Sequence, residues 1–516
     1  MQRDRTMSSK NTNKYKISTL QREVAFHSWQ TRYENEKSYG EGDNIKAKEL
    51  INIGFKEGPI IGMLLHACNR DSLLSADVIL DIVLDLYVYP ETYLDREIWR
   101  NIAEELIKIR YPDKEKEYEF KDKPFAIWGE ENIDENALEQ MRNAMRLPIV
   151  VSGAAMADCH LGYSLPIGGV VATQDTIVPS FVGGDIACRM MMTVLSISPE
   201  ELPSLEDRFI EAIDKNSRFG PGASFTHSGR KSHPVMDEDW SFAKVVKENK
   251  DLAWEQLGTS GSGNHFLDVG EIEFEDDFEI ESDAGINKGQ KFVAILTHSG
   301  SRGTGNRIAT YYSKLAQSLH NNLPQKYKQL AWLDMDSEPG QEYWAAMELM
   351  GRYASACHHI IHAGMLKSLG IASIFHVENH HNFCFKEKHG GRDLYVHRKG
   401  ATPAGNGIFG IIPGSMATPT YLVKGKGNKE SLCSVSHGAG RAMSRKQTKE
   451  TNRWSQVHGM LKERGVRLLS AGLDEVPGGY KDICQVMDAQ TDLVKVVAKF
   501  TPRIVKMAGE GEPPED

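Results

Sequence analysis

Apolar side chains recur at helical spacing in the first hundred residues. The pattern begins with Leu20, Val24, Phe26 and Trp29 and continues through AKELINIGFKEGPIIGMLLHACN and REIWRNIAEELIKIR. Such spacing indicates helices that each bury one face. We therefore predict a helical accessory domain over residues 1–120. It ends in the charged segment YPDKEKEYEFKDK, which is typical of a linker.

A different pattern follows that segment. Short runs rich in β-branched residues alternate with glycine turns, namely GGVVAT, KFVAILTH, IASIFHVEN and DLYVHRKG. Helical stretches interrupt them, including SPEELPSLEDRFIEAIDK, EYWAAMELMGRYASACHHIIHAGMLKSLG and ENALEQMRNAMRL, for which Asp134 is a candidate N-cap. This mixture predicts an α+β body over residues 125–516, with its polar motifs at strand ends and in loops.

Composition and charge exclude several classes of protein. A net charge of -10 argues against a protein that coats nucleic acid by charge alone. No apolar run reaches the roughly 18 residues of a membrane span, and the polar N-terminus lacks the apolar core of a signal peptide. Seven cysteines without framework spacing favour a reducing cytoplasm. Cations gather near the glycine-rich motifs, which is weak support for polyanion binding: Arg302, Arg307, Arg398, Lys399, Lys424, Lys426, Arg441, Arg445 and Lys446.

Four segments rich in glycine, serine or asparagine carry histidines. They are GTSGSGNHFLDVG with His265, AILTHSGSRGTGN with His298, VENHHNFCF with His380 and His381, and SVSHGAGRAMSR with His437. The segment VGGDIACRM adds Asp185 and Cys188. Together these groups supply the nitrogen, oxygen and sulfur ligands that hold a divalent transition metal. Because neighbours on a strand point to opposite faces, we expect only one of the paired histidines, His380 or His381, to face the site.

Some of these residues also fit ordinary structural roles. Taken alone, Asp185 and Cys188 are more typical of a turn cap and a small buried thiol. His358 and His362 in CHHIIHAG would share one helix face as a zinc pair does. That segment lacks the following Glu of a zinc protease and has the pattern of an amphipathic helix, so we do not assign it a metal.

The segment SHGAGRAMSR has the composition of an anion-binding turn. His437 precedes Gly-Ala-Gly, and Arg441 and Arg445 follow at the expected start of a helix. Backbone N–H groups and two guanidinium groups would hold a phosphate, and a neutral imidazole there could attack phosphorus. An incidental histidine in a glycine turn is the alternative. GIIPGSMATPTYLVKGKGN offers a second glycine turn for a nucleotide, but the sequence contains neither the Walker spacing nor a GxGxxG before a helix.

The ordered motifs resemble those of RtcB-type RNA-splicing ligases. The matching segments are MADCHLGYSLPIGG, VGGDIACRM, SGSGNHF, HSGSRGTGN, HHN, IIPGSM, SHGAGRAMSR and GGYKDI, between about Phe125 and Lys506. The resemblance implies an RtcB-like catalytic body with mixed β-sheets, helices and a deep metal-containing cleft. It also implies a GTP- and Mn(II)-dependent ligase, acting in RNA repair or tRNA splicing. Such an enzyme joins RNA ends carrying a 2′,3′-cyclic phosphate or a 3′-phosphate to 5′-hydroxyl ends.

The resemblance further implies the ligands of two Mn(II) ions. Asp185, Cys188 and His265 would hold one ion, and Cys188, His298 and His381 would hold the second. In this arrangement the Cys188 thiolate is shared between the two ions. An archease-like activating partner is also part of what the resemblance implies.

Roles in catalysis and nucleotide binding follow from the same motifs. His437 would attack the GTP α-phosphorus and pass GMP to the RNA 3′-phosphate, with Asp158 as a general acid or base near the reacting ends. Asp268 would accept hydrogen bonds from guanine N1–H and N2–H. The remaining RNA contacts would be Arg302, Arg441 and Arg445. The other nucleotide contacts would be Asn264, Asn382, Pro413, Gly414, Ser415, Met416, Thr420, Gly438, Ala439, Gly440, Tyr480 and Lys506.

Four residues depart from the family pattern. Arg189 precedes Met190 where glycine is usual, Asp268 replaces a glutamate, and Ala417 and Met507 replace glycines. The implied metal ligands and the nucleophile are all kept. We therefore expect any change to affect the guanine pocket or the RNA substrate.

Two other functions fit the same residues. A metal-dependent phosphoesterase would hydrolyse cyclic phosphates without GTP, and a non-catalytic sensor of broken RNA ends would bind RNA without turnover. The segment IGFKEGPIIGMLL resembles a short helical motif in the RNA-binding tail of tRNA nucleotidyltransferases. It would make the accessory domain an RNA-binding module, and a plain helical accessory domain is the alternative.

Overall fold

The computed structural model describes residues 45–511 apart from 57, 69–74, 111–117 and 280–284. The chain divides into two compact units. Unit 1 comprises residues 1–117 with 314–322, and unit 2 comprises 118–313 with 323–516. The apolar pattern predicted to start at Leu20 lies outside the described residues until Ile45.

Unit 1 is helical where it is described. Its helices are α2 (Ala47–Ile53), α3 (Pro59–Cys68), α4 (Ala76–Val88) and α5 (Arg100–Arg110). Apolar residues at helical spacing on all four, among them Leu50, Leu64, Val83 and Ile107, form one buried core. Packing of these buried faces stabilises helices that would be too short to persist alone.

Unit 2 is built on an eight-stranded sheet. In spatial order its strands are β13 (Phe409–Ile412), β14 (Thr420–Gly425), β17 (Val494–Met507), β6 (Phe266–Phe274), β7 (Lys291–Ser299), β5 (Arg189–Leu195) and β9 (Ser373–His380), and β16 (Arg467–Ser470) also pairs with β17. The pairings within the first seven are antiparallel, whereas β16 runs parallel to β17.

A second sheet of five strands completes the framework of unit 2. Its order is β1 (Ala126–Ile127), β2 (Val150–His160), β3 (Ile167–Thr173), β11 (Arg392–Lys399) and β10 (Asn382–His389). Two short pairs are β12 (Ala401–Pro403) with β15 (Ser434–Ser436), and β4 (Thr176–Ile177) with β8 (Leu333–Asp334). The helices are α6 (Glu135–Met145), α7 (Pro179–Val182), α8 (Leu202–Asn216), α9 (Lys244–Glu248), α10 (Lys250–Gln256), α11 (Arg302–Leu319), α12 (Glu338–Leu369), α13 (Arg445–Thr451), α14 (Trp454–Glu463) and α15 (Ile483–Asp488).

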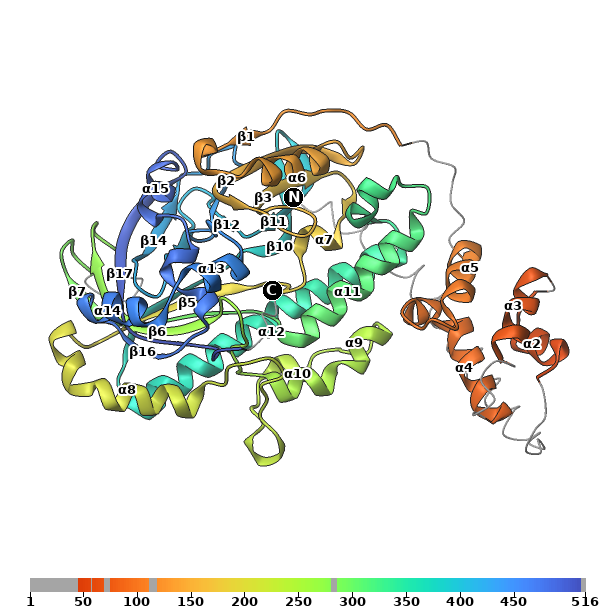
Figure 1. Ribbon diagram of the computed structural model, residues 1–516, viewed down its shortest axis with the longest axis horizontal. Helices are drawn as coiled ribbons and strands as arrows, with labels where there is room; N and C mark the ends of the chain where they lie inside the picture. Colours follow the sequence, from red (N-terminus) through yellow and green to blue (C-terminus); the bar gives the residue numbers. More distant parts are fainter. Residues whose placement is uncertain (1–44, 57, 69–74, 111–117, 280–284, 512–516) are drawn as a thin grey trace, which may run out of the picture. The chain divides into compact units, whose positions relative to one another are not determined.

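Side-chain alternation gives the eight-stranded sheet two different buried faces. On β7, Val293 and Ile295 belong to the core that includes α8 and α12, whereas Ala294 and Leu296 belong to the core on the opposite face. Figure 1 shows α8 and α12 running along one side of this sheet. His298 continues the row of Ala294 and Leu296, so the strand directs it away from the helices. The same alternation on β5, β6 and β17 decides which polar side chains reach the site.

The predicted α+β class is confirmed, and most predicted elements are present. GGVVAT, KFVAILTH, IASIFHVEN and DLYVHRKG lie in β3, β7, β9 and β11, and Asp134 caps α6 by accepting the Asn136 N–H at 2.8 Å. The helix expected around Arg441 and Arg445 begins at Arg445, as α13, so Arg441 lies before it. Gly440 has φ +73°, which breaks helical continuity before that point. Among the described residues, no helix has the length and apolar character needed to cross a bilayer.

Candidate active site

Both sheets of unit 2 contribute to one cavity of about 590 Å³. The glycine-rich turns predicted from the sequence form much of its wall. The lining segments are residues 160–163, 183–185, 381–382, 399–400, 413–416 and 437–445, with Cys188, Asn264, Phe266, Asp268, His298, Thr420, Glu475, Tyr480, Val505 and Met507 among the other contributors. The cavity therefore collects motifs that are far apart in the chain.

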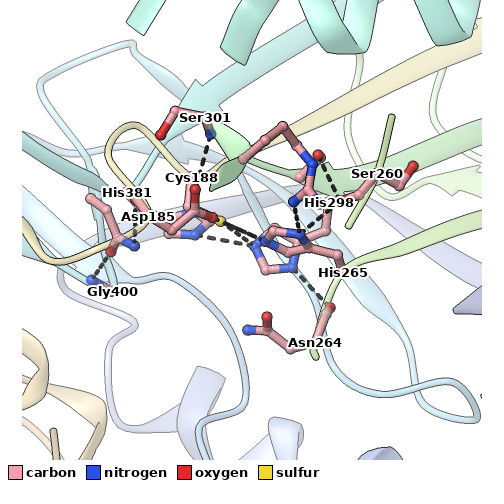
Figure 2. A network of polar contacts seen from close by, with 12 residues as sticks. Asp185, Cys188, Ser260, Asn264, His265, His298, Ser301, His381 and Gly400 are labelled. Atoms are coloured by element: carbon pink, nitrogen blue, oxygen red, sulfur yellow. Dashed lines mark hydrogen bonds and ion pairs between the residues drawn. The ribbon is translucent and has the colours of Figure 1, made fainter. Parts of the chain in front are cut away.

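A buried thiol lies at the centre of a cluster of histidines. The Cys188 Sγ is 3.1 Å from His298 Nε2 and 3.4 Å from His265 Nε2, and the ligand atoms of these three residues all lie within 4.8 Å of one another. Asp185 Oδ2 is 3.1 Å from His265 Nε2, and His381 Nε2 is 3.2 Å from His298 Nε2. Figure 2 shows the five side chains directed toward one another. All five are buried.

Hydrogen bonds at Nδ1 of two imidazoles leave the Nε2 of each ring able to bind a metal. His265 Nδ1 is 2.7 Å from the Ser260 carbonyl oxygen, and His298 Nδ1 is 3.1 Å from that of Asn264. An N–H at each Nδ1 donates to its carbonyl, so each Nε2 presents a lone pair to the Cys188 sulfur. Lone pairs of nitrogen, sulfur and oxygen atoms therefore converge on one place, with few N–H or S–H groups to pair them. A divalent cation would satisfy them, so this donor set fits a metal.

Burial keeps two imidazoles of this cluster in the neutral form that a metal requires. Desolvation lowers the pKa of His298 to about 3 and that of His381 well below its usual value. Neutral imidazoles and an ionised carboxylate are the ligand forms of these groups.

His437 lies beside this cluster and is oriented by a buried carboxylate. Its Nδ1 is 2.7 Å from Asp158 Oδ2, which also accepts the backbone N–H groups of His437 and Gly438. The ring centroids of His437 and His381 are 4.9 Å apart. With its proton on Nδ1, the His437 ring has an unprotonated Nε2 available to attack an electrophile. Asp158 itself is fully buried and does not line the cavity, which indicates a positioning role.

Asp268 lines the cavity from β6 in apolar surroundings. Phe266 shares its face of the strand, and Val505 and Met507 are the paired residues on β17. Asp268 Oδ1 is buried without a hydrogen-bond partner among the described residues. Burial raises the pKa of this carboxyl well above its usual value. An unpaired buried acceptor of this kind is expected where a ligand supplies the donor.

Alternation along strands turns two of the singled-out residues away from the cavity. Lys506 shares its face of β17 with Ile504, in the core that includes α8, and its Nζ is 2.5 Å from Asp214 Oδ1. Arg189 faces α12, where its Nη2 donates to the Gly351 carbonyl at 3.2 Å, and its Nη1 pairs with Glu378 of β9 at 2.7 Å. The structure therefore does not bring Lys506 to the nucleotide, and it directs the Arg189 departure away from the guanine pocket.

Arg302 also lies behind the cavity wall rather than in it. It is 2% exposed, and its Nη1 is 3.4 Å from His265 Nδ1. A Cβ on Gly261 would lie only 1.8 Å from that Nη1, so the guanidinium is packed closely against the glycine backbone. In this position Arg302 supports a ligand histidine and is not exposed to an RNA phosphate.

The other two arginines line the cavity but are held by acidic residues. Arg445 pairs with Asp474 and Glu475, both buried, and Arg441 Nη1 is 3.6 Å from Glu475 Oε2. The Arg441 guanidinium also lies over the Tyr480 ring, 5.2 Å from its centroid. These ion pairs leave less positive charge at the cavity than the sequence suggested.

The remaining nucleotide contacts named from the motifs line the cavity, but several are engaged. Gly438 N–H donates to Asp158 and Ala439 N–H donates to the Pro413 carbonyl, so these amides are not available to a phosphate in this conformation. Asn382 accepts the Gly400 N–H through Oδ1. The full set of these residues at the cavity is Asn264, Asp268, Asn382, Pro413, Gly414, Ser415, Met416, Thr420, Gly438, Ala439, Gly440 and Tyr480.

His358 and His362 support the metal cluster from behind. Both lie on α12. His358 Nδ1 is 2.6 Å and His362 Nε2 is 2.8 Å from Thr297 Oγ1. Thr297 and His298 are neighbours on β7 and face opposite sides of it. His380 is likewise outside the cluster and stacks on Phe385.

Sequence reasoning gave no role to several residues of the cavity. Leu161 and Tyr163 lie in the matching motif MADCHLGYSLPIGG but were assigned no function, and Glu475 was not singled out. Lys399 was noted only as one cation among several, yet it is 9% exposed at the cavity wall, and burial lowers its pKa to about 8. Its position at the end of a predicted strand, just before Gly400, was a usable signal.

The fold and cavity define a mixed α/β protein with a buried aspartate, cysteine and histidine cluster of metal-ligand type. The sequence model of the family described as "tRNA-splicing ligase RtcB" matches residues 140–253 and 231–508. The chain belongs to the RtcB family. The RNA-splicing ligase RtcB of Escherichia coli (strain K12) is 32% identical over 404 residues, covering 72% of this chain and 95% of that protein. The tRNA-splicing ligase RtcB of Nanoarchaeum equitans is 30% identical over 453 residues, covering 73% of this chain and 94% of that protein.

Proposed function

We propose that this protein is a GTP-dependent RNA ligase. It joins ends that carry a 2′,3′-cyclic phosphate or a 3′-phosphate to 5′-hydroxyl ends, in RNA repair or tRNA splicing. Membership of a family of RNA-splicing ligases supports the ligase activity. The observation that carries the proposal is the Asp158-oriented His437, whose ring lies 4.9 Å from that of His381 in the Cys188 cluster. The free cysteines also fit a cytoplasmic location.

The first step forms a covalent adduct on His437. Nε2 attacks the GTP α-phosphorus, the bond from that phosphorus to the bridging oxygen breaks, and pyrophosphate leaves. The Nδ1–H stays hydrogen-bonded to Asp158, whose buried carboxylate stabilises the positive charge that develops on the ring. Because the orienting carboxylate is buried, water does not compete for this hydrogen bond.

Two further steps join the RNA ends. A 3′-phosphate oxygen attacks the phosphorus on His437, so that the P–N bond breaks and GMP moves to the RNA. The 5′-hydroxyl oxygen then attacks the RNA phosphorus, loses its proton, and releases GMP. A cyclic phosphate must first be opened by water to give the 3′-phosphate.

The metal centre consists of two Mn(II) ions in this proposal. Asp185, Cys188 and His265 would hold one ion, and Cys188, His298 and His381 the other. When bound, the ions neutralise the negative charge of the reacting phosphates. The protein fixes the ligand orientation through the Ser260 and Asn264 carbonyl groups.

Ligation of defined ends tests the proposed function. The full chain is incubated with Mn(II), GTP and two oligonucleotides that end in a 3′-phosphate and a 5′-hydroxyl. We expect a joined product that depends on GTP and on both termini. Hydrolysis of a cyclic phosphate without GTP or joining would indicate a phosphoesterase instead. Binding of broken ends without any product would indicate a sensor. A separate arm adds an archease-type activator, and product formed only there would make that partner a requirement.

Changing Asp268 to asparagine is expected to weaken the use of GTP. The two guanine donors favour the ionised form of Asp268, which can accept both N1–H and N2–H, whereas the asparagine amide offers one acceptor and one donor group. We expect GMP transfer to fall by about 10²-fold, because a buried mismatch of donors is strongly rejected. The amide pattern is complementary to adenine N1 and N6, so ATP use relative to GTP should rise. Labelling with α-labelled GTP and ATP measures both effects.

The same variant should be more heat-stable at alkaline pH. Burial holds the folded pKa of Asp268 above its unfolded value, so the folded state retains a proton that the unfolded state loses. Stability is therefore lost as the pH rises from the unfolded pKa of Asp268 through its folded pKa. Asp268→Asn removes the effect, and we expect its Tm to exceed that of the wild type by roughly 1–4 °C at pH 8. Glu271→Gln on the same strand is the control, because Glu271 pairs with Lys291 outside the cavity. A Tm difference that does not change with pH would contradict the argument.

A further inference from the structure

Two exposed apolar side chains stand at the mouth of the cavity. Leu161 is 50% exposed and Tyr163 is 85% exposed, and both line the cavity from the loop that joins β2 to β3. Tyr163 has the largest exposed fraction among the exposed large hydrophobic residues in the described part of the chain. We call these two residues the apolar ledge. An exposed apolar feature beside a catalytic cavity is typical of a binding surface.

The loop that carries the apolar ledge is held in place by hydrogen bonds. The Gln140 side chain on α6 bonds to both backbone groups of Gly162, donating to its carbonyl at 2.6 Å and accepting its N–H at 3.0 Å. The Ser164 hydroxyl donates to the Ser180 carbonyl at 2.7 Å. The exposed Tyr163 ring is therefore presented on an ordered backbone, which lowers the entropy cost of binding.

A buried cation links the apolar ledge to the nucleophile. Lys399 Nζ is 3.4 Å from the Ser164 hydroxyl, next to Tyr163 in the chain. Gly400, the residue after Lys399, lies so close to His437 that a Cβ there would be 3.1 Å from the ring Cε1. Among the described residues no carboxylate forms an ion pair with Lys399. Lys399 and His437 line the same cavity, and the loop beside Lys399 presents an aromatic ring.

We propose that the apolar ledge stacks the terminal nucleobase of the RNA strand that carries the 3′-phosphate. The inference rests on the proposed ligase function. A 5′-hydroxyl end has no terminal phosphate to meet Lys399, whereas a 3′-phosphate end has its phosphate and its base on one nucleotide. Stacking on an aromatic ring accepts every base. The ledge would thus bind broken ends of any sequence.

The GTP base is a poorer occupant for this surface. The unpaired acceptor that suits guanine is Asp268, which lies on β6 of the eight-stranded sheet. The apolar ledge is carried by the other sheet, on the loop between β2 and β3. It also offers no described buried acceptor that would distinguish one base from another.

Kinetics of Tyr163→Ala and Tyr163→Trp test the proposal. We expect the alanine variant to raise the KM for 3′-phosphate RNA by about 5- to 100-fold, the range that the loss of one stacked base gives. The kcat should change little if stacking is equal in the ground and transition states. Labelling of His437 by GTP should stay at the wild-type level, because that step precedes RNA binding. Tyr163→Trp should restore the KM, which a merely structural role for tyrosine would not predict.

A binding measurement that needs no turnover separates this inference from the ligase proposal. The probe is a 3′-phosphate oligonucleotide with 2-aminopurine as its last base. We expect the wild type to quench the fluorescence, Tyr163→Ala to lose the quenching, and Ile408→Ala to retain it, since Ile408 is 52% exposed but does not line the cavity. Equal quenching by wild type and Tyr163→Ala would overturn the inference even if ligation occurs. Quenching that occurs only when 2-aminopurine is the first base of the 5′-hydroxyl strand would also overturn it. Quenching without any ligation would keep the ledge and reject the ligase.

Discussion

Replacing His437 with alanine is expected to abolish the covalent GMP adduct and to lower ligation by at least about 10⁴-fold, the usual scale for loss of a nucleophile. The reason is chemical, because Asp158 holds the His437 ring through Nδ1 and leaves its Nε2 available to attack phosphorus. The measurement is incubation with α-labelled GTP and Mn(II), followed by denaturing electrophoresis and intact mass. The wild type should gain the mass of GMP, and the variant should not.

A second substitution protects this result against misfolding. His437→Asn keeps an N–H donor near the position of Nδ1, so Asp158 retains a partner, but it lacks the attacking nitrogen. It should have a Tm close to that of the wild type and still form no adduct. His458→Ala is the surface control, because His458 lies on α14 against Trp454 and outside the cavity. An adduct of normal yield on either position-437 variant would exclude His437 as the nucleophile.

Asp158→Asn distinguishes two roles for the buried carboxylate. An asparagine N–H directed at Nδ1 would favour the proton on Nε2 and remove the attacking lone pair. If Asp158 positions His437, adduct formation should fall by roughly 10²–10⁴-fold. If it instead acts as a general acid or base on the RNA, the adduct should form normally and only the later joining should fail.

Replacing Cys188 with alanine is expected to have the second largest effect. Its Sγ lies within 3.4 Å of the Nε2 atoms of both His265 and His298, so its loss affects both proposed metal sites. We expect bound manganese to drop from two ions to one or none, and ligation to fall by about 10³-fold or more because metals supply several kcal/mol of charge stabilisation. Elemental analysis of the purified protein measures the metal directly.

Thermal stability gives a second measure of metal binding at Cys188. Mn(II) at a hundred times its Kd should stabilise the wild-type fold by about 2.7 kcal/mol, because it binds only the folded state. The same Mn(II) should raise the Tm of Cys188→Ala much less. Cys484→Ala is the matched control, since Cys484 is exposed and does not line the cavity. An unchanged metal content in Cys188→Ala would refute the shared-thiolate arrangement.

Local sequence patterns were sufficient to predict most strands and helices and the chemical types of the candidate metal ligands. Short β-branched runs between glycine turns predicted β3, β7, β9 and β11, and Asp134 was identified as a candidate cap from its position before a helical run. Chemistry decided the donor set, because thiol, carboxylate and imidazole groups in glycine-rich turns have few ordinary uses in such number. The first residues of the accessory domain lie outside the described part of the chain.

Side-chain alternation along strands and long-range ion pairs explain where sequence reasoning was insufficient. Lys506 and Arg189 sit in segments that also carry site residues, yet alternation sends both side chains to the face covered by α8 and α12. Arg445 was counted as a free cation, but it pairs with Asp474 and Glu475, which come from about 30 residues later in the chain. Long-range pairing of this kind has no local signature.

The sequence by itself determined which groups are available: one thiol, one carboxylate and a set of histidines in turns that allow close approach, together with membership of a recognisable family. Only the tertiary structure decided which of them meet. The tertiary structure brings together Cys188, His265, His298 and His381. They lie at strand ends on the same side of one sheet, in which β6, β7, β5 and β9 are successive neighbours. That adjacency depends on burying the two apolar faces of the sheet, a property of the whole chain that no single motif encodes.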